Sequence, residues 1–281
     1  MRMRLGFPVR IYGDDLPSYY ALTQGMPADG EHVQEGGSGS RRSPMQRASP
    51  LSLNLACLHD VLRYLEANRI HMYRLHARLL PIDADAELVD LLREIDACAG
   101  QLQLLGDLAR TTRIRLSFHP YSSVILNTPN EERAHRSQIR LHALCALLDA
   151  MRLGPEAAIV LHVGGVYDDL RCARERFVRR YEALPQRVRE RLTIENDDHR
   201  FSHAQLRLIH ESCGVRLLFD NLHHQVHNPE GIPAREALAY SLGTWPADVR
   251  PKVHFSTPRT EMRPQSGSSR IKVPTWTEHS D

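Results

Sequence analysis

The chain has 281 residues, of which 42% are hydrophobic and 25% charged, and its formal net charge is +2. This is ordinary globular composition, and a chain of this length can bury a core without disulfide bonds. The charge excludes a uniformly polycationic protein, so a nucleic-acid partner would have to meet a local basic surface.

The cysteines and the hydropathy indicate where the protein resides. Five cysteines are spread along the chain with no CxxC pair, at Cys57, Cys98, Cys145, Cys172 and Cys213. They predict reduced core residues, with neither a zinc ribbon nor a disulfide framework. The opening MRMRLGFPVR has too short an apolar run for a signal peptide, and no segment approaches about 18 apolar residues. We therefore expect a soluble, cytoplasmic protein that does not contact a membrane.

Short β-rich apolar runs alternate with longer stretches of helical periodicity. The runs predict strands at residues 4–9, 72–75, 114–118, 157–163, 192–195, 215–220 and 252–256. The stretches between them predict helices at residues 52–67, 83–108, 130–153, 170–184, 203–213 and 233–242. Strand–helix alternation repeated this often implies an α/β fold with a parallel sheet.

A single (β/α) barrel domain over residues 1–281 accounts for this order, because such barrels commonly occupy about 250 residues. Residues 10–50 would form a flexible insertion that contains GGSGSRRSP, and residues 258–281 an irregular tail. A TIM (β/α)8 barrel needs an eighth strand, so the sequence predicts a barrel truncated before that strand. A doubly wound open sheet is the alternative, but no Gly-rich nucleotide-binding fingerprint follows the first strand, and we expect no nucleotide cofactor.

Five successive predicted strands carry metal-ligating residues at their carboxyl ends. These residues are His119, His162, Glu195, Asp220 and His254, and His223 and His224 lie just beyond Asp220. In a (β/α) barrel all strand carboxyl ends meet on one face, where active sites are built. A hydrogen bond or a salt bridge would explain any one of them, but five in succession favour a shared site. Imidazoles and carboxylates suit ions such as Zn²⁺ or Mn²⁺, and two or three such ions can drive phosphodiester hydrolysis.

The strand segments, taken in order, resemble those of the UV damage endonuclease family, which belongs to the endonuclease IV-like TIM barrels. The matching segments are RLGFPV, MYRLHARLLP, LSFHP, VLHVGG, LTIENDD, LLFDNLHH and RPKVHFS, from residue 4 to residue 257. A weaker match follows at HSD, residues 279–281. The ordered set, above all ENDD followed by DNLHH and KVH, is specific to that family.

The resemblance implies a TIM barrel that holds up to three divalent ions, with Mn²⁺ favoured and Zn²⁺ or Mg²⁺ as alternatives. It implies a DNA repair endonuclease that cuts damaged double-stranded DNA on the 5′ side of pyrimidine dimers and 6-4 photoproducts. The implied metal ligands are His119, His162, Glu195, Asp220, His223, His254 and His279. Glu195 would bridge two ions. Lys252 would join it as a catalytic residue, unless it is a solvated lysine at the start of a strand. We expect the enzyme to be a monomer.

Loops after the first and third strands would probe the lesion in such an enzyme. Tyr19, Tyr20 and Tyr121 are candidates for stacking on DNA bases, although each could equally be a packing residue. Damaged nucleotides are poorly stacked, so extruding them costs less than extruding normal ones.

Three departures from the family set limits on this reading. Arg78 stands where the family has a His or Asp, and an arginine cannot bind a metal cation. His76, two residues earlier on the same face of the strand, would compensate. Tyr121-Ser122-Ser123 replaces Gly-Gln-Tyr after LSFHP. The eighth strand and its glutamate are missing, so we expect this form to be unstable or weakly active.

Three other functions fit parts of the sequence. An apurinic-site endonuclease of the endonuclease IV type would share the barrel and the metal cluster. A xylose isomerase-like sugar isomerase or epimerase also uses His, Glu and Asp at strand ends, but typically with fewer histidines. A non-enzymatic remnant would bind DNA through the Arg-rich stretch RCARERFVRRYE at residues 171–182.

Overall fold

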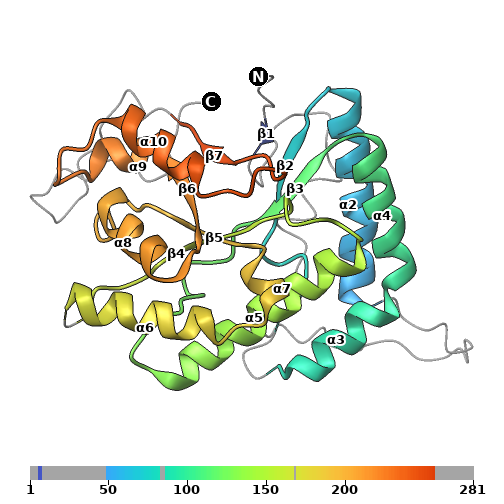
Figure 1. The fold of residues 1–281 in the computed structure, drawn as a ribbon. Coiled ribbons are helices and arrows are strands. Elements are labelled where there is room, and N and C mark those ends of the chain that lie inside the picture. Colours follow the sequence, from blue (N-terminus) through green and yellow to red (C-terminus); the bar gives the residue numbers. More distant parts are fainter. Residues whose placement is uncertain (1–5, 8–48, 83–85, 168, 257–281) are drawn as a thin grey trace, which may run out of the picture. The chain divides into compact units, whose positions relative to one another are not determined.

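The computed structural model describes residues 6–7, 49–82, 86–167 and 169–256, which belong to two compact units (Figure 1). The first unit comprises the chain up to His119 together with Ala143–Ala157, and the second comprises Pro120–His142 and the chain from Ala158 onward. The predicted loop at 36–44 and tail at 258–281 lie outside the described residues, as do Tyr19, Tyr20 and His279. A single domain over the whole chain stays a prediction.

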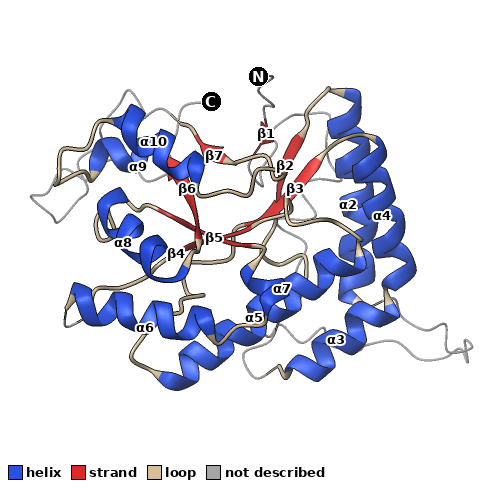
Figure 2. Cartoon of the chain, viewed as in Figure 1, coloured by secondary structure: helices blue, strands red, loops and turns tan. Residues whose placement is uncertain are grey.

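Parallel strands in chain order form the sheet of the first unit. These are β1 (Gly6–Phe7), β2 (Met72–Leu75) and β3 (Arg115–Phe118). The register places Met72 beside both Gly6 and Arg115. Helix α2 (Pro50–Ala67) packs against α4 (Ala99–Thr111), beside the strands β2 and β3, as Figure 2 shows. The predicted α/β alternation is therefore confirmed here.

The single helix predicted at 83–108 is wrong, because α3 (Leu88–Ala97) and α4 are separate helices. The break lies at Cys98, whose backbone leaves the helical region at φ −100° and ψ 9°. Cys98 is buried, and its Sγ lies 3.8 Å from Ser49 Oγ at the start of α2. Cys98 itself is neither proline nor glycine, so the packing of this buried residue, rather than its own backbone preference, accounts for the break.

The second unit contains the strands that carry the candidate site. They are β4 (Ile159–His162), β5 (Leu192–Glu195), β6 (Arg216–Asp220) and β7 (Val253–His254), each parallel to the next. The helices are α6 (Leu170–Glu182), α7 (Gln186–Arg189), α8 (His203–Cys213), α9 (Asn221–Val226) and α10 (Ala234–Gly243). Helix α5 (Glu131–Ala150) begins in this unit and ends in the first. Strands β5 and β6 are buried along their whole length, which accounts for their continuous apolar runs.

Three helices end in an arginine with a left-handed backbone. Arg69, Arg113 and Arg152 follow α2, α4 and α5 with φ of 57°, 59° and 54°. In each case the next residue's N–H donates to a carbonyl five residues back, for example Ile70 to Leu65 at 2.8 Å. This is the Schellman arrangement that closes a helix C-terminus, and it turns the chain into the next strand.

Two further sequence expectations concern cysteines and membranes. All five cysteines lie in the described part of the chain, where none is bridged; Cys98 and Cys145 are buried. Among the described residues, no helix combines the length and the apolar character that a membrane span requires.

Gly106 offers a test of the packing of the first unit. A Cβ at Gly106 would lie 1.8 Å from the carbonyl oxygen of Met151, whereas a Cβ at Gly100 on the same helix would meet nothing within 4 Å. Gly106→Ala should therefore destabilise the protein by about 1–3 kcal/mol, as overpacked cores do. Gly100→Ala should stabilise it by about 0.5–1 kcal/mol, because alanine loses less backbone entropy in a helix. Urea unfolding measures both, and effects of the same sign would contradict the packing described.

Candidate metal centre

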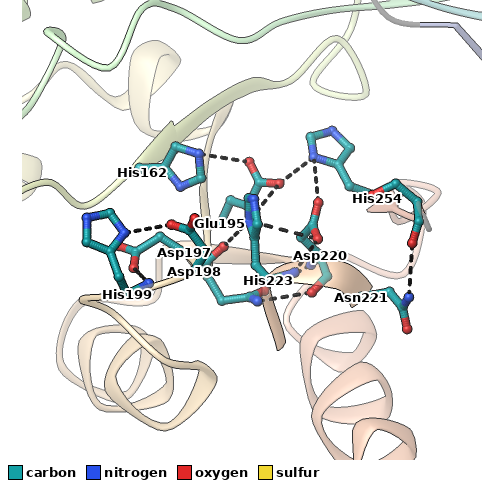
Figure 3. A network of polar contacts seen from close by, with 11 residues as sticks. His162, Glu195, Asp197, Asp198, His199, Asp220, Asn221, His223 and His254 are labelled. Carbon is teal, nitrogen blue, oxygen red and sulfur yellow. Dashed lines mark hydrogen bonds and ion pairs between the residues drawn. The ribbon is translucent and has the colours of Figure 1, made fainter. Parts of the chain in front are cut away.

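Glu195 lies at the centre of a cluster of histidines and carboxylates at the strand ends of the second unit (Figure 3). It is the last residue of β5 and is only 1% exposed. Its Oε1 lies 2.5 Å from His254 Nδ1 on β7, and its Oε2 lies 3.6 Å from His162 Nε2 on β4. The register places His162 directly beside Glu195, so the parallel pairing of β4 with β5 produces this contact.

Asp220 and His223 complete the cluster from the next strand and the helix that follows it. Asp220 ends β6, and its Oδ1 caps α9 by accepting the N–H of His223 at 2.8 Å. This cap sets the start of α9 and turns the His223 ring toward Glu195, with Nδ1 3.9 Å from Oε1. The other oxygen of Asp220 lies 3.9 Å from His254 Nδ1. The geometry therefore brings together five of the residues predicted to bind metal.

Asn196 connects the two strand ends that carry the carboxylates. Its side chain donates to the carbonyl of Asp220 at 3.0 Å and accepts the Asp220 N–H at 2.9 Å. Its own carbonyl accepts a hydrogen bond from His223 Nδ1 at 2.8 Å. Because a carbonyl only accepts, the proton is on Nδ1, and the lone pair of Nε2 is left as the ligand atom of a neutral His223.

The electrostatics show whether these residues fit a metal ion. Burial, together with the charge of Glu195, raises the pKa of Asp220 to about 7. Burial lowers the pKa of His223, but the charges of Glu195 and Asp220 outweigh this effect and raise it overall. The negative charges of the two buried carboxylates, Glu195 and Asp220, are therefore not fully compensated. A divalent ion would supply the missing positive charge in place of protons. Ligand atoms of Glu195, Asp220 and His254 lie within 4.8 Å of one another, so the donor set fits such an ion.

The family model described as UV-endonuclease UvdE matches residues 45–281 of the chain. The chain belongs to this family. The resemblance drawn from the ordered strand segments is therefore confirmed.

Individual relatives agree with the family. The chain is 27% identical to the UV DNA damage endonuclease of Clostridium perfringens over 229 residues, which are 80% of this chain and 55% of that protein. It is also 27% identical to the UV DNA damage endonuclease of Bacillus pumilus over 210 residues, which are 74% of this chain and 65% of that one. The chain thus spans less than two thirds of the length of these relatives.

Solved structures show the same fold. The solved structure of SacUVDE aligns with 96% of this chain and covers 86% of the SacUVDE chain, with a TM-score of 0.74 and 27% identity. D-psicose 3-epimerase from Clostridium cellulolyticum H10 matches 71% of this chain and 67% of its own with a TM-score of 0.51, at only 12% identity. The second likeness shows the fold alone. The chain therefore has a parallel α/β fold similar to that of SacUVDE and of the TIM-barrel sugar epimerases.

The other predicted site residues that the structure describes lie in different parts of the two units. His119 directly follows β3 in the first unit. Lys252 precedes β7 and is only 6% exposed, so it is not a solvated lysine. Tyr121 is 44% exposed in the loop that begins the second unit.

The predicted relation of His76 to Arg78 is wrong. Strand β2 ends at Leu75, so both residues lie in the turn that follows it. His76 Nδ1 accepts the N–H of Arg78 at 3.0 Å, and Arg78 is exposed. A turn closed by this hydrogen bond does not alternate like a strand, so the argument from a shared strand face does not apply.

The Arg-rich helix α6 has a structural role at its buried end. Arg180 of α6 is 5% exposed and donates to the carbonyl of Leu126 at 2.6 Å and to the carboxylate of Glu131 at 2.6 Å. This arginine holds the segment before α5 and is not available to a phosphate.

His203 and His224 are two further buried histidines of the second unit. His203 begins α8 but is only 3% exposed, and its Nε2 lies 3.2 Å from Ser241 Oγ. Its ring meets those of Tyr240 and His224 edge-on, at centroid distances of 5.9 and 6.3 Å. Burial, together with the nearby His224 and Arg207, lowers the pKa of His203 to about 4, against a weaker opposing charge from Glu230. His203 is therefore neutral in the folded protein.

His203 should make the protein less stable as the pH falls. In the unfolded chain the His203 imidazole binds a proton near pH 6.5, whereas in the folded chain it binds one only near pH 4. Acidification between these values therefore favours unfolding. The loss is about 3 kcal/mol, is complete near pH 4 and is absent above pH 7. Urea unfolding at several pH values should show a shallower acid loss for His203→Gln than for the parent. Subtracting the two curves removes the titration of Asp220 and His223. An equal loss of stability on acidification in the parent and in His203→Gln would contradict the lowered pKa of His203.

Proposed function

We propose that this chain is a divalent-metal-dependent DNA repair endonuclease that hydrolyses the phosphodiester on the 5′ side of UV photoproducts in double-stranded DNA. The observation that carries the proposal is Glu195, which is almost fully buried and yet lies among His162, His254 and Asp220. A carboxylate in this position is costly unless it is paired with cations. Membership of the UV-endonuclease family supports DNA as the substrate.

The metal ligands we propose are those of the sequence analysis. His162, Glu195, Asp220, His223 and His254 come from the second unit, His119 from the first, and His279 from outside the described residues. Mn²⁺ is the ion we favour, with Zn²⁺ and Mg²⁺ as alternatives. Bound divalent ions would supply Lewis-acid stabilisation of the phosphate charge and a nucleophile at neutral pH.

The chain's own residues would prepare the site for that chemistry. Glu195 holds the rings of His162 and His254 on either side of one carboxylate, and its contacts with both make it the proposed bridging ligand. The raised pKa of Asp220 means that its carboxyl group releases a proton when a cation enters. Lys252, buried two residues before His254, is the second catalytic residue we propose, and Tyr121 is the proposed lesion contact.

A plasmid nicking assay tests the proposal. Supercoiled plasmid, irradiated with UV light or not, is incubated with the protein and Mn²⁺, with EDTA as the control. We expect metal-dependent nicking of irradiated plasmid only. Cleavage of plasmid with abasic sites but not of irradiated plasmid would favour the apurinic-site alternative. No nicking by a folded protein that binds Mn²⁺ would overturn the proposal.

A further inference from the structure

The loop from β4 to α6 holds a strained aromatic residue that the proposed metal centre does not use. Among the described residues, four that are not glycine have positive φ, and three of them close helices as described above. The fourth, Tyr167, has φ 59° but lies before α6, not at the end of a helix. Strain of this kind persists only where the surrounding structure holds it, and it is concentrated at ligand sites.

The Tyr167 ring is held in place by its neighbours but is not buried. A Cβ at Gly165 would lie 3.0 Å from the Tyr167 ring, so glycine lets the ring lie against the backbone there without displacement. The Arg176 guanidinium carbon of α6 lies 5.5 Å from the ring centroid. Tyr167 is nevertheless 41% exposed, which leaves much of its surface to a ligand.

The polar groups beneath the ring are incompletely paired. Arg176 Nε donates to the carbonyl of Asn127 at 2.8 Å, and Asn127 Nδ2 donates to the carbonyl of Gly165 at 2.7 Å. Arg176 Nη2 and Asn127 Oδ1 are both buried and have no hydrogen-bond partner, although Asn127 is fully buried. A Cβ at Gly164 would meet Asn127 Oδ1 at 2.4 Å, so this glycine keeps the loop close to Asn127. Unpaired buried groups are rare in native proteins, so these two atoms mark the loop as more than a packed turn.

Asp169, the first acidic residue after Tyr167 that the structure describes, is engaged at the start of α6. Asp169 caps α6, and its carboxylate accepts the N–H groups of Arg171 and Cys172 at 2.9 and 3.2 Å. The loop follows His162, so it leaves the same strand end that contributes a ligand to the metal centre. An exposed aromatic ring, a guanidinium group and a nearby phosphodiester-cutting site match the alternating bases and phosphates of a nucleic-acid strand.

We propose that Tyr167 and Arg176 form a DNA-strand contact, with a base stacked on Tyr167 and an adjacent phosphate bound by Arg176. The inference rests on the proposed function and extends it to residues outside the metal centre. Gly164 and Gly165 then have a structural role in this contact, because they place the Tyr167 ring over Arg176.

Fluorescence anisotropy with a short labelled, UV-irradiated duplex in EDTA measures this contact without cleavage. Tyr167→Gly should weaken DNA binding by about tenfold, because a stacked base is lost, whereas Tyr167→Phe should bind within about twofold of the parent because it keeps the ring. Glycine accepts the backbone conformation of residue 167, so the melting temperature of Tyr167→Gly should not fall. A purely structural tyrosine would lower the melting temperature and leave binding intact.

Arg176→Ala should lower the slope of log affinity against log salt by about 0.9, the effect of one lost phosphate contact. Arg171→Ala on the same helix is the matched control, because Arg171 is exposed and its Nε lies 3.9 Å from Glu175. Its slope should equal that of the parent.

If the parent nicks irradiated plasmid and Tyr167→Gly binds DNA normally, the contact is wrong and the proposed function stands. If the parent does not nick but Tyr167→Gly loses DNA binding, the function is wrong and the contact stands.

Discussion

Replacing Glu195 by glutamine should abolish Mn²⁺-dependent nicking while leaving the protein folded. The change removes the charge of the proposed bridging ligand, which His162 and His254 flank, and keeps its size. Loss of a residue that only supports a ligand typically costs about 10–100-fold, so loss of a direct bridging ligand should exceed about 100-fold. Nicking rates on irradiated plasmid measure the effect.

The same variant should behave differently with and without metal in thermal unfolding. In EDTA its melting temperature should equal or exceed that of the parent, because a buried charge beside Asp220 is gone. Mn²⁺ at about 100 times its dissociation constant should stabilise the parent by about 2.7 kcal/mol, and the variant much less. Glu190→Gln is the control, since Glu190 is exposed and its carboxylate accepts a hydrogen bond from Gln186 at 2.8 Å. Normal nicking by Glu195→Gln would remove Glu195 from the mechanism.

The sequence predicted the strand ends of the second unit because two physical signals coincide there. Continuous apolar runs mark β5 and β6, which are buried along their whole length, and a carboxylate closes each of these two runs. Glu195 and Asp220 therefore end β5 and β6 as expected, and β2 and β5 have the predicted bounds. Parallel pairing of β5 with β6 then brings those two ends together. The order of the apolar runs along the sequence can therefore indicate that the two carboxylates are neighbours.

What the sequence did not predict depends on contacts between segments. Helix α9 has only six residues, Asn221–Val226, and no periodicity in so short a stretch distinguishes it from a loop. The role of Asn196 was also missed, because an asparagine between two acidic residues reads as part of a polar loop. The buried state of His203 follows from packing against α10, since its position at the start of α8 suggests exposure. Each of these features is set by tertiary packing that local propensity does not record.

Asn196→Ala should weaken metal binding by about 10–100-fold even though Asn196 is not a proposed ligand. Its side chain fixes the backbone of Asp220 through two hydrogen bonds, and its carbonyl orients His223. Without the side chain, two buried backbone groups of Asp220 lose their partners, at a cost of about 2–4 kcal/mol in the free energy of unfolding. The carbonyl of residue 196 is then no longer fixed to β6, so both ligands lose their orientation.

A matched asparagine separates positioning of the ligands from general destabilisation. Asn228 makes the same pair of bonds, donating to the carbonyl of Ile232 at 2.8 Å and accepting its N–H at 3.0 Å. Asn228→Ala should therefore lose stability while its Mn²⁺ affinity, measured by calorimetric titration, stays within about twofold of the parent, because no proposed ligand is held by this asparagine. Equal losses of affinity in the two variants would mean that destabilisation alone weakens the site. A loss confined to Asn196→Ala would show that the amide between β5 and β6 keeps Asp220 and His223 in place for the metal.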